Sequence, residues 1–546
     1  MTKFIFTVGG VYSGTGKGVA SAAIGLLLKM RGLKIEIIKF DPYLNTNAGT
    51  LSPSQHGESF VTDDGCEVDL DLGTYERLAG INVSGRNICT SGTVYSEIIQ
   101  GHERGDYLGQ SVQLIPHFTE KIHKRLFDLA KDNDIVIAEI GGTVGDDESA
   151  GMYEAVAQFK YQHPDDVIVI MVAPIIYNET VKEFKTKPLQ NAVRTLRNVG
   201  IQPDILLCRA SKNVDKAILE KISKFTYISK DAIFDAPDVK TIYQVPLEFY
   251  DRHVDDLIAD RFHLPRKGVK IRKYRELVER YTNGHDLPTV KIGIVGKYDN
   301  CDEAYISLKE ALIHAAVAND TKLEIDWINA EDLEGKDPRS LWRHFQGVHG
   351  IVVPGGFDIR GVEGKIRSIY HVREKKIPFL GICLGLQCAV IEFSRHVLGL
   401  EAATSEEFDK NAIDKVIHYI AGQENISSKS GTMRLGAYDC KLEEDSLALK
   451  FYKQPLISER HRHRYEVNAK YVPDFLEKSF KVTGKNPDSG LVEIMELDEN
   501  IHPYFVGTQA HPEFKSRLGN PSPLFDGLIK AACVRMLSEV NETVAK

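Results

Sequence analysis

The sequence predicts an α/β protein made of two doubly wound domains, each built on a mostly parallel sheet. Short apolar runs alternate with longer amphipathic stretches, which is the pattern of strands separated by helices. The strand runs are apolar throughout, as expected when both faces of a sheet are buried. This series occurs twice in 546 residues, with a charged segment between, so we expect two large domains.

The first series of apolar runs predicts the sheet of an N-terminal domain, which we assign to residues 1–266. Its strands are expected at residues 4–8, 35–40, 135–140, 167–173 and 205–208. A segment rich in Lys and Arg follows, and we expect it to be an interdomain linker over 267–289 with a short charged helix.

The second series predicts a C-terminal domain over residues 290–546. Its strands are expected at 290–296, 323–328, 350–354 and 377–382. Residues 432–514 contain several turn signals between β-rich runs, which indicates an antiparallel, β-rich extension of this domain.

Charge and cysteine content restrict the class of function. The net charge is -9, so no excess of Lys and Arg is available for broad binding to nucleic acid or to an anionic membrane. Eight scattered cysteines without a CxxC pair favour a reducing compartment over a disulfide framework or a zinc site. The chain passes from Met1 directly into an apolar strand, and no apolar run is long enough to cross a bilayer, so we expect a cytoplasmic protein.

Residues 9–18 form a glycine-rich segment between the first strand and a predicted helix over 19–30. Glycines allow backbone N–H groups to turn toward a phosphate, and Lys17 can reach the terminal phosphates. Gly18 occupies the position where the common phosphate loop has Ser or Thr. A magnesium ion therefore needs other ligands, and Asp71 and Glu139 are the candidates. The alternative is a plain glycine turn, which does not account for the lysine, strand and helix in register.

Cys383 lies in the segment Gly-Ile-Cys-Leu-Gly, directly after a predicted strand. Glycine two residues to either side permits the sharp turn that exposes a nucleophile. We expect His511 to pair with the thiol and Glu513 to orient the imidazole, while Gly355 and Gly356 offer N–H groups to an oxyanion. A buried structural cysteine is the alternative, and we assign that role to Cys388 on the following helix.

Residues 460–464, Arg-His-Arg-His-Arg, contain two histidines at spacing i, i+2. Without acidic or cysteine partners this is a weak metal signal, and we expect Arg464 to hold a carboxylate instead.

Because it contains both the phosphate-binding segment and the cysteine turn, the chain resembles the CTP synthase family. Members of this family have an amidoligase domain fused to a class I glutamine amidotransferase domain. The matching segments are 41–43, 55–58, 69–73, 105–109, 139–146, 185–188, 354–357, 360–364, 431–436 and 460–466. The resemblance implies ATP-dependent amination of UTP to CTP through a 4-phosphorylated UTP, with ammonia from glutamine or free ammonia. It further implies Mg²⁺, activation by GTP, inhibition by CTP, and a homotetramer that can form filaments.

The resemblance also implies roles for individual residues. ATP would contact Gly14, Thr15, Gly16, Lys17, Gly18, Val19, Lys39, Asp71 and Val239, with Asp71 and Glu139 on the metal. UTP or CTP would contact Ser13, Asp146, Asp147, Glu148, Lys185, Thr186, Lys187, Pro188, Leu189, Gln190 and Lys221. Glutamine would contact Gly356, Leu384, Gly385, Leu386, Gln387, Glu407 and Arg464, and a GTP-responsive lid would contain Arg360, Gly361 and Glu363.

Three departures from the family pattern bear on regulation. Asp147 and Leu189 replace Ile and Thr near the pyrimidine nucleotide, and Asp358-Ile359 replaces Gly-Tyr before the lid. Two alternative interpretations are an ATP-dependent ligase that amidates another acceptor, such as a corrin, and a nucleotide-binding scaffold that polymerises without catalysis. The 185–188 and 460–465 segments count against the first, and the combined presence of both sets of reactive residues counts against the second.

Overall fold

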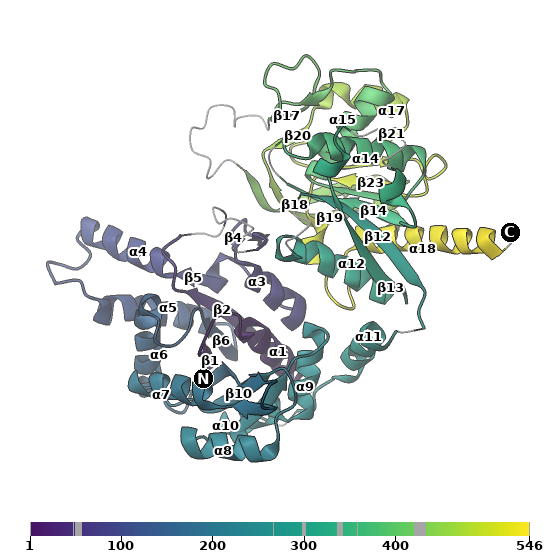
Figure 1. The fold of residues 1–546 in the computed structure, drawn as a ribbon. Coiled ribbons are helices and arrows are strands. Elements are labelled where there is room, and N and C mark those ends of the chain that lie inside the picture. The colour runs from purple at the N-terminus through teal and green to yellow at the C-terminus, as the bar shows by residue number, and fades with distance from the viewer. Residues whose placement is uncertain are drawn as a thin grey trace. The chain divides into compact units, whose positions relative to one another are not determined.

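The structure is a computed structural model that describes residues 2–46, 49, 57–265, 267–284, 286–297, 302–335, 342–356, 359–419 and 433–544 (Figure 1). Gln55, His56, Phe357, Asp358, Gly431 and Thr432, which belong to the segments discussed above, lie outside the described residues. The chain divides into two compact units. The first contains Met1–Thr50 and Val68–Val278, and the second contains Leu51–Glu67 and Glu279–Lys546.

The first unit contains a seven-stranded sheet in the order β11-β10-β7-β1-β6-β2-β5, and every neighbouring pair is parallel. Its strands are β1 (Lys3–Gly9), β2 (Ile35–Asp41), β5 (Ile88–Thr90), β6 (Ile135–Ile140), β7 (Val167–Pro174), β10 (Ile205–Ala210) and β11 (Ile233–Pro237). The predicted parallel sheet is therefore confirmed, and β5 and β11 are additions at its two edges.

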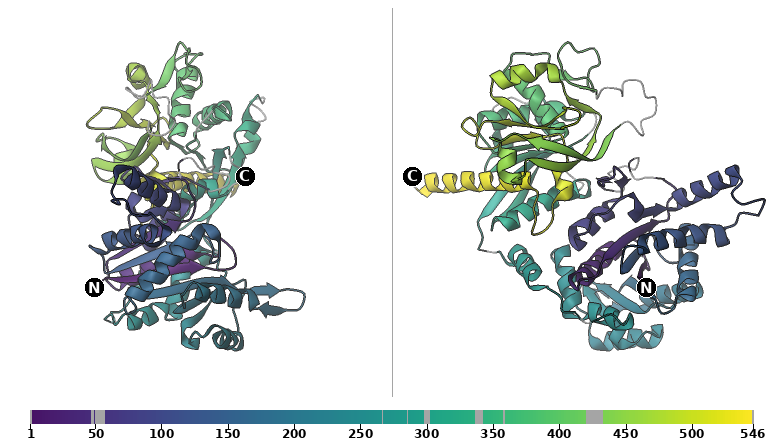
Figure 2. Two further views of the ribbon diagram at one scale, coloured as in Figure 1. Left: turned by 90° about the vertical axis from the view of Figure 1, so that its left-hand side faces the viewer. Right: turned by 180° about the vertical axis from the view of Figure 1, so that it is seen from behind.

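Helices cover both faces of this sheet (Figures 1 and 2). They are α1 (Lys17–Met30), α3 (Leu70–Thr74), α4 (Ser91–Arg104), α5 (Thr119–Ala130), α6 (Ala150–Gln162), α7 (Lys187–Asn198), α8 (Lys216–Thr226), α9 (Val245–Asp251) and α10 (Val254–Arg261). Phe4 packs edge-on against Phe159 of α6, with ring centroids 4.8 Å apart, on one face. On the other face, Gly25 brings α1 close to Ile35 and Ile137. Each face of the sheet is thus buried under a layer of helices, and the edge where the strands have their carboxyl ends stays available for ligands.

The second unit is built on a nine-stranded sheet in the order β13-β12-β14-β15-β23-β22-β21-β18-β19. Its strands are β12 (Thr289–Gly296), β13 (Lys322–Asn329), β14 (Gly350–Val353), β15 (Phe379–Ile382), β18 (Arg434–Leu442), β19 (Leu456–His463), β21 (Phe480–Lys485), β22 (Val492–Leu497) and β23 (Phe505–Thr508). The strands from β13 to β23 are parallel and the rest are antiparallel. The predicted β-rich extension is thus the antiparallel end of one mixed sheet.

A small three-stranded sheet and six α-helices also belong to the described part of this unit. The small sheet contains β16 (Thr404–Ser405), β17 (Lys415–Tyr419) and β20 (Tyr465–Val467). The helices are α12 (Ile306–Ala318), α14 (Val362–Glu374), α15 (Leu384–His396), α16 (Leu447–Tyr452), α17 (Val472–Glu477) and α18 (Pro523–Val544). Helices α14 and α15 contribute to one hydrophobic core, and α12 and α18 contribute to a second core.

The charged helix expected between the domains is present as α11 (Arg272–Asn283). Its start is held in the first unit, where the Tyr274 hydroxyl donates to the Tyr243 carbonyl at 2.8 Å. Its end is held in the second unit by an Arg280–Asp320 ion pair at 3.2 Å. Among the described helices, none is both long and apolar enough to span a membrane.

One segment departs from the linear domain order, because residues 51–67 belong to the second unit. The described part of this segment includes β3 (Phe60–Val61) and leads into β4 (Glu67–Val68). The Ala437 N–H donates to the Asp63 carbonyl at 2.9 Å, and the rings of Phe60 and Phe514 lie 5.0 Å apart. No pattern in the sequence indicated this packing, since it depends on contacts between residues about 400 positions apart.

The fold of the first unit generates a stability prediction at Arg31, which follows α1. Its guanidinium pairs with Asp255 and Asp256 at the start of α10, and the side chains of Arg31 and Asp255 are 5% and 1% exposed. Arg31→Met leaves Asp255 as a buried charge without its partner, which costs about 3–5 kcal/mol. We expect a clear fall in the thermal midpoint of the transition that unfolds the first unit, measured by calorimetry.

The matched control is Lys131→Met, which removes an exposed partner of Asp128, with side chains 71% and 43% exposed. Such surface pairs contribute about 0–1 kcal/mol. Equal midpoints for the two variants would contradict the assigned importance of the buried pair.

Candidate active sites

The glycine-rich segment joins β1 to α1 and forms a cradle at the helix N-terminus. Gly16 precedes α1 with φ of +86°, a left-handed conformation that glycine adopts without strain. Lys17 begins the helix, is buried, and its Nζ donates to the Gly142 carbonyl at 2.8 Å. A Cβ at Gly9 would lie 2.7 Å from Lys17 Nζ, so this glycine leaves the space that the lysine occupies. The geometry is that of an anion site with one positioned ammonium.

Two carboxylates converge on the first turn of α1. Oxygens of Asp71 and Glu139 both lie 3.2 Å from the point where a Cβ of Gly18 would be. Burial raises the pKa of Glu139, and the nearby Asp71 charge raises it further. The described residues contain no cluster of three or more potential metal-binding His, Cys, Asp or Glu. Two convergent carboxylates fit Mg²⁺, which takes one or two protein carboxylates and completes its shell with phosphate and water.

Lys39 on β2 lies among carboxylates. Its ammonium pairs with Asp41 at 3.5 Å, with Asp69 at 3.2 Å, and with Asp71. Although burial acts in the opposite direction, these acids raise the pKa of Lys39 well above its ordinary value. Lys39 was predicted to contact ATP phosphates, and the structure places it where it balances the charge of the acidic group.

A cavity of about 210 Å³ adjoins the cradle. It is lined by three residues predicted to contact ATP, namely Gly16, Val19 and Val239, together with apolar side chains that include Phe249. Arg209, which the sequence analysis missed, also lines it and donates to the carbonyls of Ala236 and Pro237 at 3.0 Å. The cavity has the apolar walls and polar rim that a nucleobase requires.

The residues predicted to contact the pyrimidine nucleotide come from the loop after β6, from the start of α7, and from α8. Asp146, Asp147, Glu148, Lys185, Lys187 and Lys221 are exposed, as is Ser13 of the cradle. Gly10 approaches Ala192 of α7, so the cradle and this helix are neighbours. Leu189 is fully buried in the hydrophobic core, so its side chain does not face a ligand. Thr186 is also buried, and its hydroxyl accepts a hydrogen bond from Gln190 at 3.0 Å.

In the second unit, Cys383 forms a strained turn between β15 and α15. Its φ is +50° and its ψ is -103°, a conformation that is costly for any residue with a Cβ. A Cβ at Gly385 would lie 2.1 Å from the Val353 carbonyl, so only glycine permits this close approach of helix and strand. The expected turn is therefore present, with the thiol at its apex.

His511 lies beside Cys383, as predicted. Its Nδ1 lies 2.7 Å from Glu513 Oε1, and its backbone N–H donates to the Arg460 carbonyl at 2.7 Å. Burial alone would lower the pKa of His511, but the Glu513 carboxylate and a hydrogen bond with Cys383 raise it to about 10. The imidazole is thus held as a cation at neutral pH, which suits a thiolate partner.

Several of the residues predicted to hold glutamine lie on the helix that follows Cys383. Leu384, Gly385, Leu386 and Gln387 form the first turn of α15 and are buried. Gln387 Nε2 donates to the Tyr465 carbonyl at 3.0 Å, and the charge of Glu407 raises the pKa of Tyr465 while that of Arg464 lowers it. The sequence analysis missed Gln509, whose Nε2 lies 3.5 Å from Cys383 Sγ. A lone glutamine carries no recognisable motif.

The predicted lid residues lie at the start of α14. Arg360 pairs with Glu331 at 3.3 Å, and Glu363 pairs with Arg395 at 2.9 Å. Gly361 precedes the helix with φ of +74°. These contacts fix the beginning of α14 within the second unit.

Strand β19 has different partners on its two faces. Arg460 and Arg462 face the 57–67 segment, where they pair with Asp63 at 2.6 Å and with Glu67 at 2.8 Å. His461 and His463 lie in the interior, with ring nitrogens 3.1 Å apart, and burial lowers the pKa of both.

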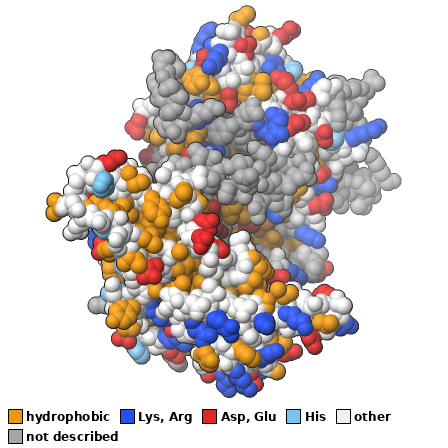
Figure 3. Space-filling model, turned by 60° about the vertical axis from the view of Figure 1, so that its left-hand side comes forward, with side chains coloured by type: hydrophobic (Ala, Val, Ile, Leu, Met, Phe, Trp, Pro, Cys, Tyr) orange, Lys and Arg blue, Asp and Glu red, His pale blue; other side chains and the backbone are white. Residues whose placement is uncertain are grey.

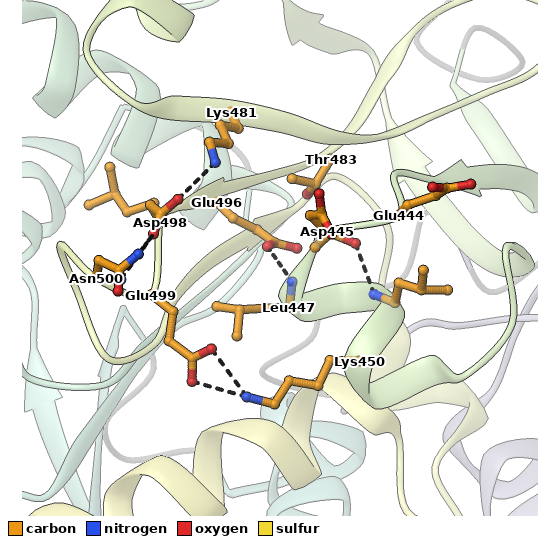
Figure 4. Close-up of a pocket in the computed structure, with 13 residues that line it drawn as sticks. Glu444, Asp445, Leu447, Lys450, Lys481, Thr483, Glu496, Asp498, Glu499 and Asn500 are labelled. Atoms are coloured by element: carbon orange, nitrogen blue, oxygen red, sulfur yellow. Dashed lines mark hydrogen bonds and ion pairs between the residues drawn. The ribbon is translucent and has the colours of Figure 1, made fainter.

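Another cavity, of about 490 Å³, lies elsewhere in the second unit (Figure 4). It contains none of the predicted site residues. Both lysines that line it are paired, because Lys481 contacts Asp498 at 2.8 Å and Lys450 contacts Glu499 at 3.0 Å. Glu496 accepts hydrogen bonds from the N–H groups of Leu447 and Ala448 at the start of α16. We interpret it as a surface hollow with structural ion pairs.

Comparisons with known proteins find a known family for each half of the chain. Residues 3–264 match the family "CTP synthase N-terminus", and residues 301–531 match "Glutamine amidotransferase class-I". CTP synthase of Methanococcus maripaludis is 47% identical, and the match covers 97% of this chain and 99% of that protein. CTP synthase of Methanocaldococcus jannaschii is 48% identical, with 97% and 98% covered.

Among solved structures, the glutaminase domain of Trypanosoma brucei CTPS with bound acivicin is 35% identical. The match covers 45% of this chain and 94% of that one, with a TM-score of 0.43. The two full-length relatives span nearly the whole chain at an identity that leaves no doubt about descent. The chain therefore belongs to the CTP synthase family, the glutamine-hydrolysing ligases that carry a synthase domain and a class I amidotransferase domain in one polypeptide.

Proposed function

We propose that the chain aminates UTP to CTP, consuming ATP in residues 1–266 and hydrolysing glutamine in residues 290–546. The observation that carries the proposal is the presence in one chain of a phosphate cradle with two convergent carboxylates and of a cysteine-histidine-glutamate group at a strained turn. Either site alone is common to many enzymes. Their combination, in a member of this family, matches an enzyme that makes ammonia and uses it.

In the glutaminase half-reaction, the Cys383 thiolate attacks the side-chain amide carbon of glutamine. A C–S bond forms, and the carbonyl π electrons move to oxygen, which the N–H groups of Gly355 and Gly356 stabilise. His511 then donates a proton to the leaving nitrogen, so ammonia departs and a glutamyl thioester remains. Water hydrolyses the thioester and regenerates the thiol. The high pKa of His511 supports its role as proton donor at neutral pH.

In the synthase half-reaction, the cradle holds the phosphates of ATP, and the adjoining cavity takes the adenine. The uracil 4-oxygen attacks the γ-phosphorus, and ammonia then displaces the phosphate from carbon 4. Mg²⁺ bound by Asp71 and Glu139 would neutralise charge on the transferred phosphoryl group. Lys17 adds a positioned cation at the same place.

Regulation follows from the nucleotide sites. UTP and CTP share a triphosphate, which the exposed ammonium groups of Lys185, Lys187 and Lys221 can bind. CTP can therefore compete with UTP as a feedback inhibitor. We further propose that GTP activates glutamine hydrolysis through the start of α14, where Arg360 and Glu363 lie.

An apolar surface supports the proposed homotetramer. Exposed apolar side chains gather on α4, on η3 (Leu114–Phe118) and on α5 of the first unit: Tyr95, Ile99, Leu114, Ile115 and Phe127. Figure 3 shows hydrophobic side chains concentrated on a face of this unit. Patches of this kind mark sites of protein association. Filament formation and a cytoplasmic location are proposed on the family resemblance and on the sequence alone.

The first experiment separates the two half-reactions by removing the nucleophile. Cys383→Ala should abolish glutamine-dependent CTP formation, because no thioester can form, while ammonium chloride still supports synthesis. The measurement is CTP formation from UTP, ATP and magnesium with either nitrogen source. The matched control is Cys388→Ala, five residues along α15 and also buried, which should retain both activities. Failure of ammonia to rescue a folded Cys383→Ala protein would refute the division into two sites.

The second experiment tests the cradle. Lys17→Ala should lower the rate of CTP synthesis about 100-fold or more with either nitrogen source, because the phosphates lose their positioned cation. Basal glutamine hydrolysis should remain. Lys29→Ala, at the other end of α1, is the control and should behave as wild type. If Lys17→Ala kept its ammonia-dependent synthesis, ATP would have to bind elsewhere.

The third experiment concerns the protonation of His511. Because the Glu513 carboxylate helps to hold the pKa of His511 at about 10, Glu513→Gln should bring it back toward or below its ordinary value. The imidazolium would then be lost as pH rises through the lower pKa, so the variant should lose activity above about pH 6.5. We expect kcat for glutamine hydrolysis to fall about 100-fold at pH 8, and the pH optimum of this reaction to move to a lower pH.

The control for this experiment is Glu499→Gln, whose carboxylate is exposed and pairs with Lys450. Its pH profile of glutamine hydrolysis should match the wild-type profile. An unchanged alkaline limb in Glu513→Gln would mean that Glu513 does not set the charge of His511.

A further inference from the structure

Lys365 is a buried lysine that the mechanism above does not use. It lies in the first turn of α14 and its side chain is 0% exposed. In the part of the chain that the structure describes, it forms no ion pair with a carboxylate, and the Pro354 carbonyl, at 3.1 Å from Nζ, is its one hydrogen-bond acceptor.

An unpaired ammonium in the interior is expensive. Removing a charge from water costs several kcal/mol unless a partner of opposite charge compensates, and one carbonyl oxygen compensates only in part. A methionine of similar length would fill the same space without that cost. The charge at this position therefore has physical value only if an interaction nearby requires it.

The surroundings of Lys365 identify that interaction. The Pro354 carbonyl belongs to the loop after β14, which continues through Gly355 and Gly356. A Cβ at Gly356 would lie 3.8 Å from Lys365 Nζ, and a Cβ at Gly355 would lie 2.7 Å from His511 Cε1 and 3.5 Å from Cys383 Cβ. The loop thus has the lysine on one side and the cysteine-histidine pair against its first glycine.

Peptide geometry connects the two sides. In a trans peptide the C=O of one residue and the N–H of the next point in opposite directions. A hydrogen bond that holds the Pro354 carbonyl toward Lys365 therefore fixes the Gly355 N–H on the opposite side of the loop. That N–H is one of the two donors assigned to the oxyanion of the tetrahedral intermediate.

We propose that Lys365 is a positioning residue for glutamine hydrolysis: it holds the Pro354–Gly355 peptide so that the Gly355 N–H meets the developing oxyanion, and its positive charge adds to the stabilisation. This inference rests on the proposed glutaminase reaction. Lys365 does not touch the substrate, so its contribution belongs to the transition state and should change kcat rather than KM.

The protonation of Lys365 supplies an independent readout. The pKa of Lys365 is lowered to about 8, because burial and the charge of Lys297, just after β12, outweigh the opposite effects of Cys388 of α15 and of Cys383. The ammonium is therefore present below about pH 8 and is lost as pH rises through that value. Wild-type kcat for glutamine hydrolysis should show an alkaline limb near pH 8, below the range in which His511 loses its proton.

The test uses the full chain with Lys365→Met and Lys365→Gln. Lys365→Met removes both the hydrogen bond and the charge, and glutaminase kcat should fall about 10- to 100-fold with KM for glutamine within about twofold, since a lost oxyanion donor costs about 10²–10³. Lys365→Gln retains a hydrogen-bond donor without the charge, so its loss should be smaller. Both variants should lose the limb near pH 8 and retain ammonia-dependent CTP synthesis.

A second measurement distinguishes oxyanion stabilisation from damage to the nucleophile. Iodoacetamide alkylates a thiol by displacement of iodide, which creates no oxyanion, so the alkylation rate of Cys383, followed by mass spectrometry of its peptide, should stay within about threefold of wild type. The structural control is Arg373→Met on the same helix, which breaks the buried pair with Glu392. It should lower the thermal midpoint while leaving kcat and the pH profile unchanged.

Three results would overturn the proposal: unchanged kcat in a folded Lys365→Met protein, a parallel fall in hydrolysis and in Cys383 alkylation, or a limb near pH 8 that persists in both variants. If Lys365→Met does not fold, the kcat of Lys365→Gln and the wild-type pH profile test the proposal instead. Failure of the proposed function itself is recognised separately, because wild-type protein would then hydrolyse no glutamine.

Discussion

The backbone of β19 holds the cysteine-histidine site of the second unit in place. The Arg460 carbonyl accepts the His511 N–H at 2.7 Å, and the Arg462 carbonyl lies 3.8 Å from Cys383 Sγ, so one strand sets the position of both members of the pair. The side chains of the same strand are fixed on both faces. Arg460 is completely buried and donates to Asp63 and to the Val61 carbonyl, while His461 and His463 contact each other inside the unit. A strand held on both faces cannot shift register without breaking these contacts, so the cysteine-histidine geometry is rigid.

This arrangement gives the 57–67 segment a structural role in the glutaminase unit. The segment is encoded in the N-terminal half, but its side chains complete the packing around Arg460 and Phe514. The Ser307 hydroxyl and N–H at the start of α12 also donate to Glu58 of this segment. Disturbing these contacts would loosen the strand that holds His511. The two functional halves are therefore not independent modules placed end to end along the chain.

The sequence was sufficient for the parts of the structure that depend on local pattern. Continuous apolar runs predicted nine strands of the two main sheets, and glycine spacing predicted the cradle at Gly16 and the turn at Cys383, because each of these features needs residues of a particular size at fixed spacing. The short edge strands β5 and β11 were missed because three to five residues carry too little periodicity. Gln509 and Lys365 were missed because their importance comes from three-dimensional neighbours, and a single amide or ammonium carries no pattern. The buried side chain of Leu189 likewise became visible only once α7 was placed on the sheet.

Three buried lysines show how charge environment separates structural roles from functional ones. Lys39 is surrounded by Asp41, Asp69 and Asp71, and their charges keep it protonated and satisfied without any ligand. For Lys17, burial is the largest influence and lowers its pKa, the charges of Glu139, Asp71 and Asp41 act in the opposite direction, and its Nζ donates to the Gly142 carbonyl. Lys365 donates to the Pro354 carbonyl, and no carboxylate among the described residues pairs with it. An ammonium that donates to a carbonyl and is not paired directly with a carboxylate keeps more of its attraction for an anion that arrives later, because its charge is less fully cancelled. In each of the two units, such a lysine lies where the proposed reaction brings negative charge: phosphate at the cradle, and the oxyanion at the strained turn.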